Sequence, residues 1–169
     1  MAFSLKKYQQ TALDELQKYI AEMKEYKPEK AAGVAFMTLR TDSQDNFPKE
    51  YHWIPELGRS PFVCVKVPTG GGKTLIAAHS VGVVFKDYLG ERSDRGLVIW
   101  FVPSDAIKTQ TLDNLRNRNH PYREVLDERF ENAIKVFDLS EAKAIKKADL
   151  ADNLCIVVST LSAFRRTDK

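Results

Sequence analysis

The chain has 169 residues, enough for one domain with a sizeable core, and its 43% apolar and 29% charged residues are ordinary for a globular protein. Lys and Arg outnumber Asp and Glu by 26 to 23, and this small excess permits a nucleic-acid partner without indicating one. No apolar run approaches the roughly 18 residues of a membrane span, and the first residues are too polar for a signal peptide. We therefore expect a cytoplasmic protein with no membrane partner.

The first 60 residues are predicted to form a helix and an insertion. Apolar residues recur at near-helical spacing over residues 4–26, and Pro28 disfavours a longer helix. Residues 33–39 and 51–54 have the composition of strands, and the polar stretch 41–49 between them fits the loop of a β-hairpin. We assign residues 1–28 to an N-terminal helical segment and residues 29–60 to an insertion of unassigned role.

From residue 61 to residue 169, short apolar runs alternate with helical patterns. Strands are expected at residues 62–67, 97–102, 133–137 and 154–159. Helices are expected at residues 73–88, 106–118, 121–130, 140–150 and 161–166. Such alternation predicts an α/β fold, with a parallel sheet flanked by helices and right-handed crossovers.

A glycine-rich motif lies between the first of these strands and the helix that follows it. It is Val67-Pro68-Thr69-Gly70-Gly71-Gly72-Lys73-Thr74, which departs from the usual phosphate-binding P-loop pattern only at its first position. Glycines are needed there because phosphate oxygens must come within hydrogen-bonding distance of successive backbone N–H groups, and side chains would block the approach. The N-terminus of the following helix favours an anion.

The motif makes ATP and Mg²⁺ the expected cofactors. Lys73 can reach the β and γ phosphates, and the Thr74 hydroxyl can ligate the Mg²⁺ that bridges them. Thr69, Gly70, Gly71 and Gly72 supply the loop around the phosphates. The competing interpretation, a glycine-rich turn with an exposed lysine, is disfavoured by the strand expected before the motif and the amphipathic helix expected after it.

Several segments of the sequence resemble the motifs of a known family and occur in the same order. The form Pro68 to Thr74 is typical of motif I in superfamily 2 helicases, and Leu5-Lys6-Lys7-Tyr8-Gln9 is similar to the Leu-Arg-x-Tyr-Gln signature that opens their first motor domain. Val102-Pro103-Ser104 is similar to motif Ia, and residues 156–160 are similar to the strand before motif Ib. The chain most resembles the branch that contains the helicase subunit of type III restriction enzymes and DEAD/DEAH-type proteins.

This resemblance implies a RecA-like P-loop fold and an ATP-dependent helicase or translocase that acts on nucleic acid, with DNA expected. It implies that Gln9 contacts the adenine edge, and that Pro103, Ser104, Thr160 and Arg165 lie against the nucleic-acid backbone. The partners it implies are a second RecA-like domain and, in a restriction system, a methyltransferase or nuclease subunit.

One expected element of this family does not occur in the sequence. The Walker B or DEAD/DEAH box should be an apolar strand ending in Asp-Glu after motif Ib, and no such strand occurs before Lys169. The pairs at 14–15 and 127–128 fall in expected helices, and Asp138 ends a strand without a following Glu. We therefore interpret the chain as the N-terminal part of a larger ATPase, either a fragment or a truncated gene product. Because hydrolysis also needs an arginine finger from the second domain, we expect the isolated chain to be inactive.

Two other functions stay open on the sequence. One is a P-loop ATPase or small kinase outside the helicases, which would need an acceptor pocket and an arginine-bearing lid. The other is a non-catalytic module that binds nucleotide without turnover.

Overall fold

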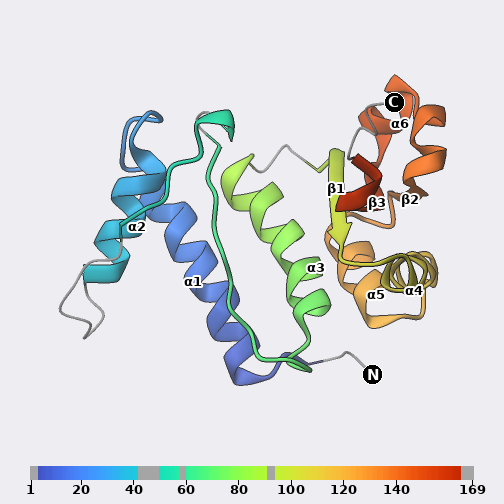
Figure 1. Cartoon of the computed structure of the whole chain (residues 1–169), viewed down its shortest axis with the longest axis horizontal. Coiled ribbons are helices and arrows are strands. Elements are labelled where there is room, and N and C mark those ends of the chain that lie inside the picture. Colours follow the sequence, from blue (N-terminus) through green and yellow to red (C-terminus); the bar gives the residue numbers. More distant parts are fainter. Residues whose placement is uncertain (1–3, 42–49, 58–59, 91–93, 165–169) are drawn as a thin grey trace. The chain divides into compact units, whose positions relative to one another are not determined.

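The computed structural model describes residues 4–41, 50–57, 60–90 and 94–164 (Figure 1). The chain forms two compact units, Met1–Ile76 and Ala77–Lys169, each with a hydrophobic core of its own. None of the described helices combines the length and the apolar character needed to cross a bilayer.

The first unit is built on two packed helices, α1 (Lys7–Met23) and α2 (Ala31–Thr41), which lie beside each other in Figure 1. Tyr19 and Met23 of α1 share a buried cluster with the alanines at the start of α2, Ala31, Ala32 and Ala35. The Tyr19 hydroxyl donates a hydrogen bond of 3.1 Å to the Ala32 carbonyl. The helix predicted over residues 4–26 is therefore confirmed.

The β-hairpin predicted within residues 29–60 is wrong. Residues 33–39 lie in α2, because the small residues Ala31, Ala32 and Ala35 recur at helical spacing and pack against α1. Residues 51–54 have no regular structure, and a 3₁₀ turn, η1 (Pro55–Leu57), follows them. The predicted hairpin loop falls largely on residues 42–49, which lie outside the described residues.

Aromatic packing explains what residues 51–53 do instead. The rings of Phe36, Tyr51 and Trp53 form a series of edge-to-face contacts, with centroids 5.7 and 4.9 Å apart. A Cβ at Gly33 would lie 2.9 Å from the Trp53 ring, so the absence of a side chain there permits this packing against α2. Trp53 therefore has a structural role in the insertion.

The strand predicted at residues 62–67 is also wrong. The described residues 60–68 have no regular structure, and Phe62, Val63 and Val65 are exposed. A strand needs a neighbouring backbone to pair with, and the described strands pair only with one another. A turn follows at residues 69–70, within the glycine-rich motif.

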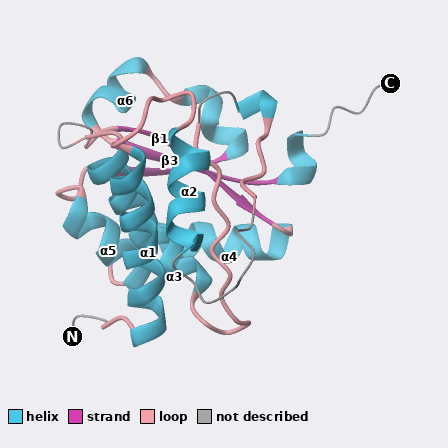
Figure 2. Ribbon diagram, turned by 90° about the vertical axis from the view of Figure 1, so that its left-hand side faces the viewer, coloured by secondary structure: helices cyan, strands magenta, loops and turns pink. Residues whose placement is uncertain are grey.

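The second unit contains a three-stranded parallel sheet in the order β1–β3–β2, drawn in magenta in Figure 2. Its strands are β1 (Gly96–Val102), β2 (Ile134–Asp138) and β3 (Leu154–Thr160), which confirms the other three predicted strands and their parallel arrangement. Every residue of the central strand β3 is buried. The second unit is thus α/β, with a parallel sheet flanked by helices, as the sequence predicted.

Helices on either side of β1 in the chain supply the core of this unit. The helix α3 (Lys73–Val83), which crosses the unit boundary, continues into a π-helical turn, η2 (Val84–Tyr88). The helices α4 (Asp105–Arg116) and α5 (Pro121–Arg129) follow β1. In this core, Phe85, Leu115, Leu126 and Phe130 pack in one cluster with buried residues of the three strands.

The prediction of a single helix at residues 140–150 is wrong, because two separate helical segments occur there. A 3₁₀ segment, η3 (Leu139–Ala144), is followed by a separate short helix, α6 (Lys147–Asp152). The break arises because Ile145 and Lys146 both adopt extended backbone angles. The last described element is a 3₁₀ turn, η4 (Leu161–Phe164).

Candidate nucleotide-binding site

The glycine-rich motif forms a tight loop directly before α3. The Gly71 N–H donates to the Pro68 carbonyl over 3.0 Å, and Gly70 and Gly72 both adopt left-handed backbone angles, with φ of +74° and +76°. The Ile76 N–H then donates to the Gly72 carbonyl over 3.0 Å, which begins the hydrogen bonding of α3. Left-handed residues close together in a turn are the geometry that directs backbone N–H groups toward an anion.

Two of the glycines leave no room for a side chain. A Cβ at Gly71 would lie 2.6 Å from Cγ1 of Val67, and a Cβ at Gly72 would lie 2.5 Å from Nε2 of Gln9. The glycine composition is therefore required by the neighbours of the loop as well as by its backbone angles.

Helix α1 holds the loop through Gln9, which the resemblance implied as a nucleotide contact. Gln9 is 4% exposed, and its Nε2 donates to the Gly71 carbonyl over 2.9 Å across 62 positions of the chain. Its Oε1 accepts the Lys6 N–H over 2.9 Å at the first turn of α1. Both ends of the Gln9 amide are thus fixed, and the side chain lies against the glycine-rich loop.

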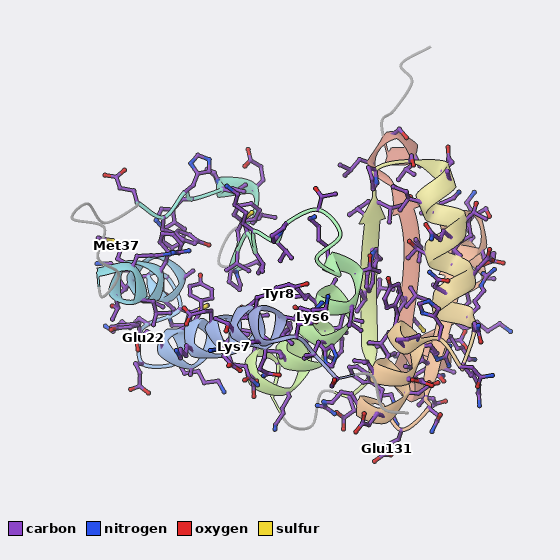
Figure 3. The ribbon with its side chains drawn as sticks, turned by 90° about the horizontal axis from the view of Figure 1, so that it is seen from below. Lys6, Lys7, Tyr8, Glu22, Met37 and Glu131 are labelled. Carbon is purple, nitrogen blue, oxygen red and sulfur yellow. The ribbon has the colours of Figure 1, made fainter. Side chains whose placement is uncertain are left out.

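A second donor to the same carbonyl was missed by the sequence analysis. The Tyr8 hydroxyl donates to the Gly71 carbonyl over 3.0 Å, although Tyr8 as a whole residue is 42% exposed. Figure 3 labels Tyr8 and Lys6 at the beginning of α1. No local sequence signal indicates this contact, since it joins residues 63 positions apart.

The polar residues of the motif lie at the entrance of α3. Lys73 is exposed, and its ammonium donates to the Pro68 carbonyl over 2.9 Å. Thr74 lies in the first turn of the helix and is partly buried, while Thr69 is exposed in the turn. A positive charge, a helix N-terminus and the loop therefore occupy one short stretch of chain.

These residues fit a triphosphate with its magnesium ion. The glycine loop accepts oxygens that side chains would exclude, and the ammonium of Lys73 matches their charge. Magnesium prefers few protein ligands together with phosphate oxygens and water, so one hydroxyl, that of Thr74, suffices on the protein side. Among the described residues, no group of three His, Cys, Asp or Glu could hold a metal alone.

Comparison with known proteins decides the family. The family model described as "Type III restriction enzyme, res subunit" matches residues 2–169. The chain belongs to this family. The family comprises N-terminal motor domains of superfamily 2 helicases, and it is helicase-like and ATPase-like in general. No curated protein and no solved structure matched the chain.

The candidate nucleic-acid residues of this family member lie in the second unit, at the ends of the strands. Val102 and Thr160 are register partners at the carboxyl ends of β1 and β3, so Pro103 and Ser104, which follow β1, lie at the same edge of the sheet as Thr160. The Ser104 side chain accepts the Ile107 N–H over 3.4 Å and caps α4. Thr160 is 4% exposed, with its hydroxyl 3.0 Å from that of Ser162. Arg165 lies outside the described residues.

The acidic residues that were candidates for a Mg²⁺-binding carboxylate form ion pairs or hydrogen bonds with other residues. Asp127 lies in α5 and forms an ion pair of 2.8 Å with Arg123, and both side chains are buried. Asp138 accepts from the hydroxyl and N–H of Ser140 and pairs with Lys108 at 3.0 Å, and these partners lower its pKa to about 2. Asp14 accepts from Gln10 within α1. These carboxylates have local structural partners.

Proposed function

We propose that this chain is the ATP-binding part of an ATP-dependent DNA helicase or translocase of a restriction system. The observation that carries the proposal is the glycine-rich loop whose Gly71 carbonyl is held by Gln9 of α1, directly before Lys73 and Thr74. The family of the chain supports a helicase-like ATPase motor.

Each residue of the loop has a role in this proposal. The backbone N–H groups of residues 70 and 72–74 bind the phosphate oxygens, and Lys73 neutralises the charge of the β and γ phosphates. The Thr74 hydroxyl would hold the magnesium ion, which would supply positive charge to neutralise those phosphates. Thr69 lines the entrance of the loop.

Gln9 keeps enough hydrogen-bonding capacity to contact adenine. An amide side chain has two N–H donors and two lone pairs on oxygen. Gly71 uses one donor and Lys6 uses one lone pair. One N–H and one lone pair therefore remain, and this is the pair needed for N7 and the exocyclic amine of adenine.

The sheet edge of the second unit is the proposed nucleic-acid surface. Pro103 and Ser104 follow β1, Thr160 ends β3, and Arg165 comes five residues later. Main-chain N–H groups and hydroxyls at such an edge bind a phosphate backbone without selecting a sequence. The remaining partners in this proposal are a second RecA-like domain, which supplies the arginine finger, and a methyltransferase or nuclease subunit, all in the cytoplasm.

Calorimetric titration with Mg-ATP tests the nucleotide claim. Lys73→Ala is expected to weaken binding about 10- to 100-fold, because it removes a charge-assisted hydrogen bond to phosphate. Lys66→Ala is the matched control, since it removes the same charge from an exposed lysine seven residues earlier and should leave affinity unchanged. Equal affinities for the wild type and Lys73→Ala would refute the proposal.

The engaged carboxylates favour a second candidate, a module that binds nucleotide without turnover. Asp127 and Asp138 have strong local partners, so neither is available to hold magnesium and orient an attacking water. This candidate predicts that the isolated chain binds ATP, that Lys73→Ala reduces this binding, and that phosphate release is negligible. DNA-stimulated phosphate release would exclude it, whereas transfer of phosphate to a small acceptor would indicate a kinase instead of either.

A further inference from the structure

Two side chains of α1 converge on one carbonyl of the phosphate-binding loop. The Tyr8 hydroxyl lies 3.0 Å from the Gly71 oxygen, and Nε2 of Gln9 lies 2.9 Å from the same atom. A carbonyl oxygen has two lone pairs, so both donors can bind it at once. The Gly71 carbonyl is therefore held on the side of the loop that faces α1.

Holding this carbonyl also orients the next backbone donor. The peptide bond is planar and trans, so the C=O of Gly71 and the N–H of Gly72 point in opposite directions. With the oxygen fixed toward α1, the Gly72 N–H is directed away from α1. A flip of this peptide would instead turn a carbonyl oxygen toward the phosphates and repel them.

Glycines make such a flip accessible unless another group opposes it. Gly70 and Gly72, on either side of Gly71, both have positive φ, and glycine populates these angles and their mirror images about equally. The loop backbone alone therefore does not select one orientation of the Gly71–Gly72 peptide, and the donors on Gly71 supply the selection.

Tyr8 differs from Gln9 in what else it can do. Gln9 retains capacity for a base, whereas the Tyr8 hydroxyl has one proton and donates it to Gly71. Tyr8 as a whole residue is 42% exposed, so the hydroxyl is not needed to satisfy a buried core. The contribution of this hydroxyl is thus confined to the loop.

We infer that Tyr8 is a positioning residue of the nucleotide site, whose hydroxyl fixes the Gly71–Gly72 peptide with its N–H toward the phosphates of a nucleoside triphosphate. This inference rests on the proposed function, since it assigns the phosphates to the glycine-rich loop. It separates two tasks within α1: Tyr8 acts on the phosphate site alone, and Gln9 acts on the phosphate site and the base.

Tyr8→Phe tests the inference because it removes only the oxygen. We expect calorimetric titration to show about three- to tenfold weaker binding, the effect of one neutral hydrogen bond, by the same factor for Mg-ATP, Mg-GTP and inorganic tripolyphosphate. In amide NMR spectra, the Gly72 N–H should shift in the variant without ligand, and its response to tripolyphosphate should shrink. Tyr26→Phe, which loses a hydroxyl bonded to Glu22 in the same helical unit, is the matched control and should change neither measurement.

The possible results separate this inference from the proposed function. If the wild type binds none of the three ligands, the proposed function fails and the inference fails with it. If the wild type binds and Tyr8→Phe binds equally well, only the inference fails. A loss confined to ATP would place the hydroxyl at the base and overturn the inference too. The NMR measurement reports on folded molecules, so partial unfolding of the variant would not mask an unchanged Gly72 amide.

Discussion

The two units position their candidate residues by different means. In the first unit, the glycine-rich loop has irregular backbone, and hydrogen bonds from Tyr8 and Gln9 hold it. In the second unit, the regular pairing of β1 with β3 brings Ser104 and Thr160 to one edge of the sheet. The loop therefore depends on a few local contacts, whereas the sheet edge depends on the hydrophobic core beneath it.

The largest expected effect concerns that core. Phe130 is fully buried and packs edge-to-face on Phe85 at 5.4 Å. Phe130→Ala should lower the free energy of unfolding by about 3–5 kcal/mol, through lost burial and a residual cavity. Chemical denaturation followed by circular dichroism measures it. The matched control is Phe62→Ala in the first unit, where the side chain is 45% exposed, and similar losses for both would contradict the comparison.

A smaller effect is expected for the glycines of the loop. Alanine at Gly70 or Gly72 must adopt a positive φ, which costs roughly 1–2 kcal/mol. Only at Gly72 does the new Cβ also collide, at 2.5 Å from Nε2 of Gln9, while at Gly70 nothing lies within 4 Å. Thermal unfolding should therefore show a lower stability for Gly72→Ala than for Gly70→Ala. Equal stabilities would mean that Gln9 does not lie against Gly72.

The cap of α4 should contribute less. Ser104→Ala removes the acceptor for the Ile107 N–H, and the 3.4 Å bond is long and exposed, so we expect a loss of about 0.5–1 kcal/mol in unfolding free energy. Ser104→Asp keeps a capping oxygen and should restore the stability. Should both variants match the wild type, the cap would be without energetic consequence, and Ser104 would be free for a role at the nucleic-acid surface.

The smallest effect is a pH dependence at the end of β2. The Ser140 hydroxyl and N–H, and then Lys108, lower the pKa of Asp138 from 3.8 to about 2. A lowered folded-state pKa means that the stabilisation is present above about pH 4 and is lost as the pH falls toward 2. Ser140→Ala should raise the pKa of Asp138, as followed by NMR titration of the carboxyl carbon. An unchanged pKa would remove Ser140 as the main cause.

The sequence predicted the parts of the molecule in which local chemistry decides the conformation. The glycines at 70–72 and Lys73 indicated a phosphate loop because few other functions require that composition. Leu97 to Val102 and Leu154 to Val158 are continuous apolar runs, and each lies in a strand of the parallel sheet. The cap of α4 is also a local feature, since the Ser104 hydroxyl directly precedes the helix.

The sequence predictions failed where contacts with residues far away in the sequence determine the conformation. Residues 33–39 have the composition of a strand, but they lie in a helix because Ala31, Ala32 and Ala35 pack against α1. Residues 62–67 have strand propensity, but the described strands offer them no pairing partner. The contact of Tyr8 with Gly71 joins residues 63 positions apart, and no local sequence pattern indicates it. The division of the chain at residues 28 and 60, and the roles of Thr160 and Arg165, stay predictions.

The central claim is that residues 70 and 72–74 bind the phosphates of ATP through their backbone. Titration of the ¹⁵N-labelled chain with Mg-ATP tests it most directly, because each amide reports separately. We expect the largest changes in chemical shift at the amides of residues 70–74 and at the Gln9 side chain, with all of them strongly reduced in Lys73→Ala. Binding that leaves these amides unmoved, or that persists unchanged in Lys73→Ala, would contradict the account.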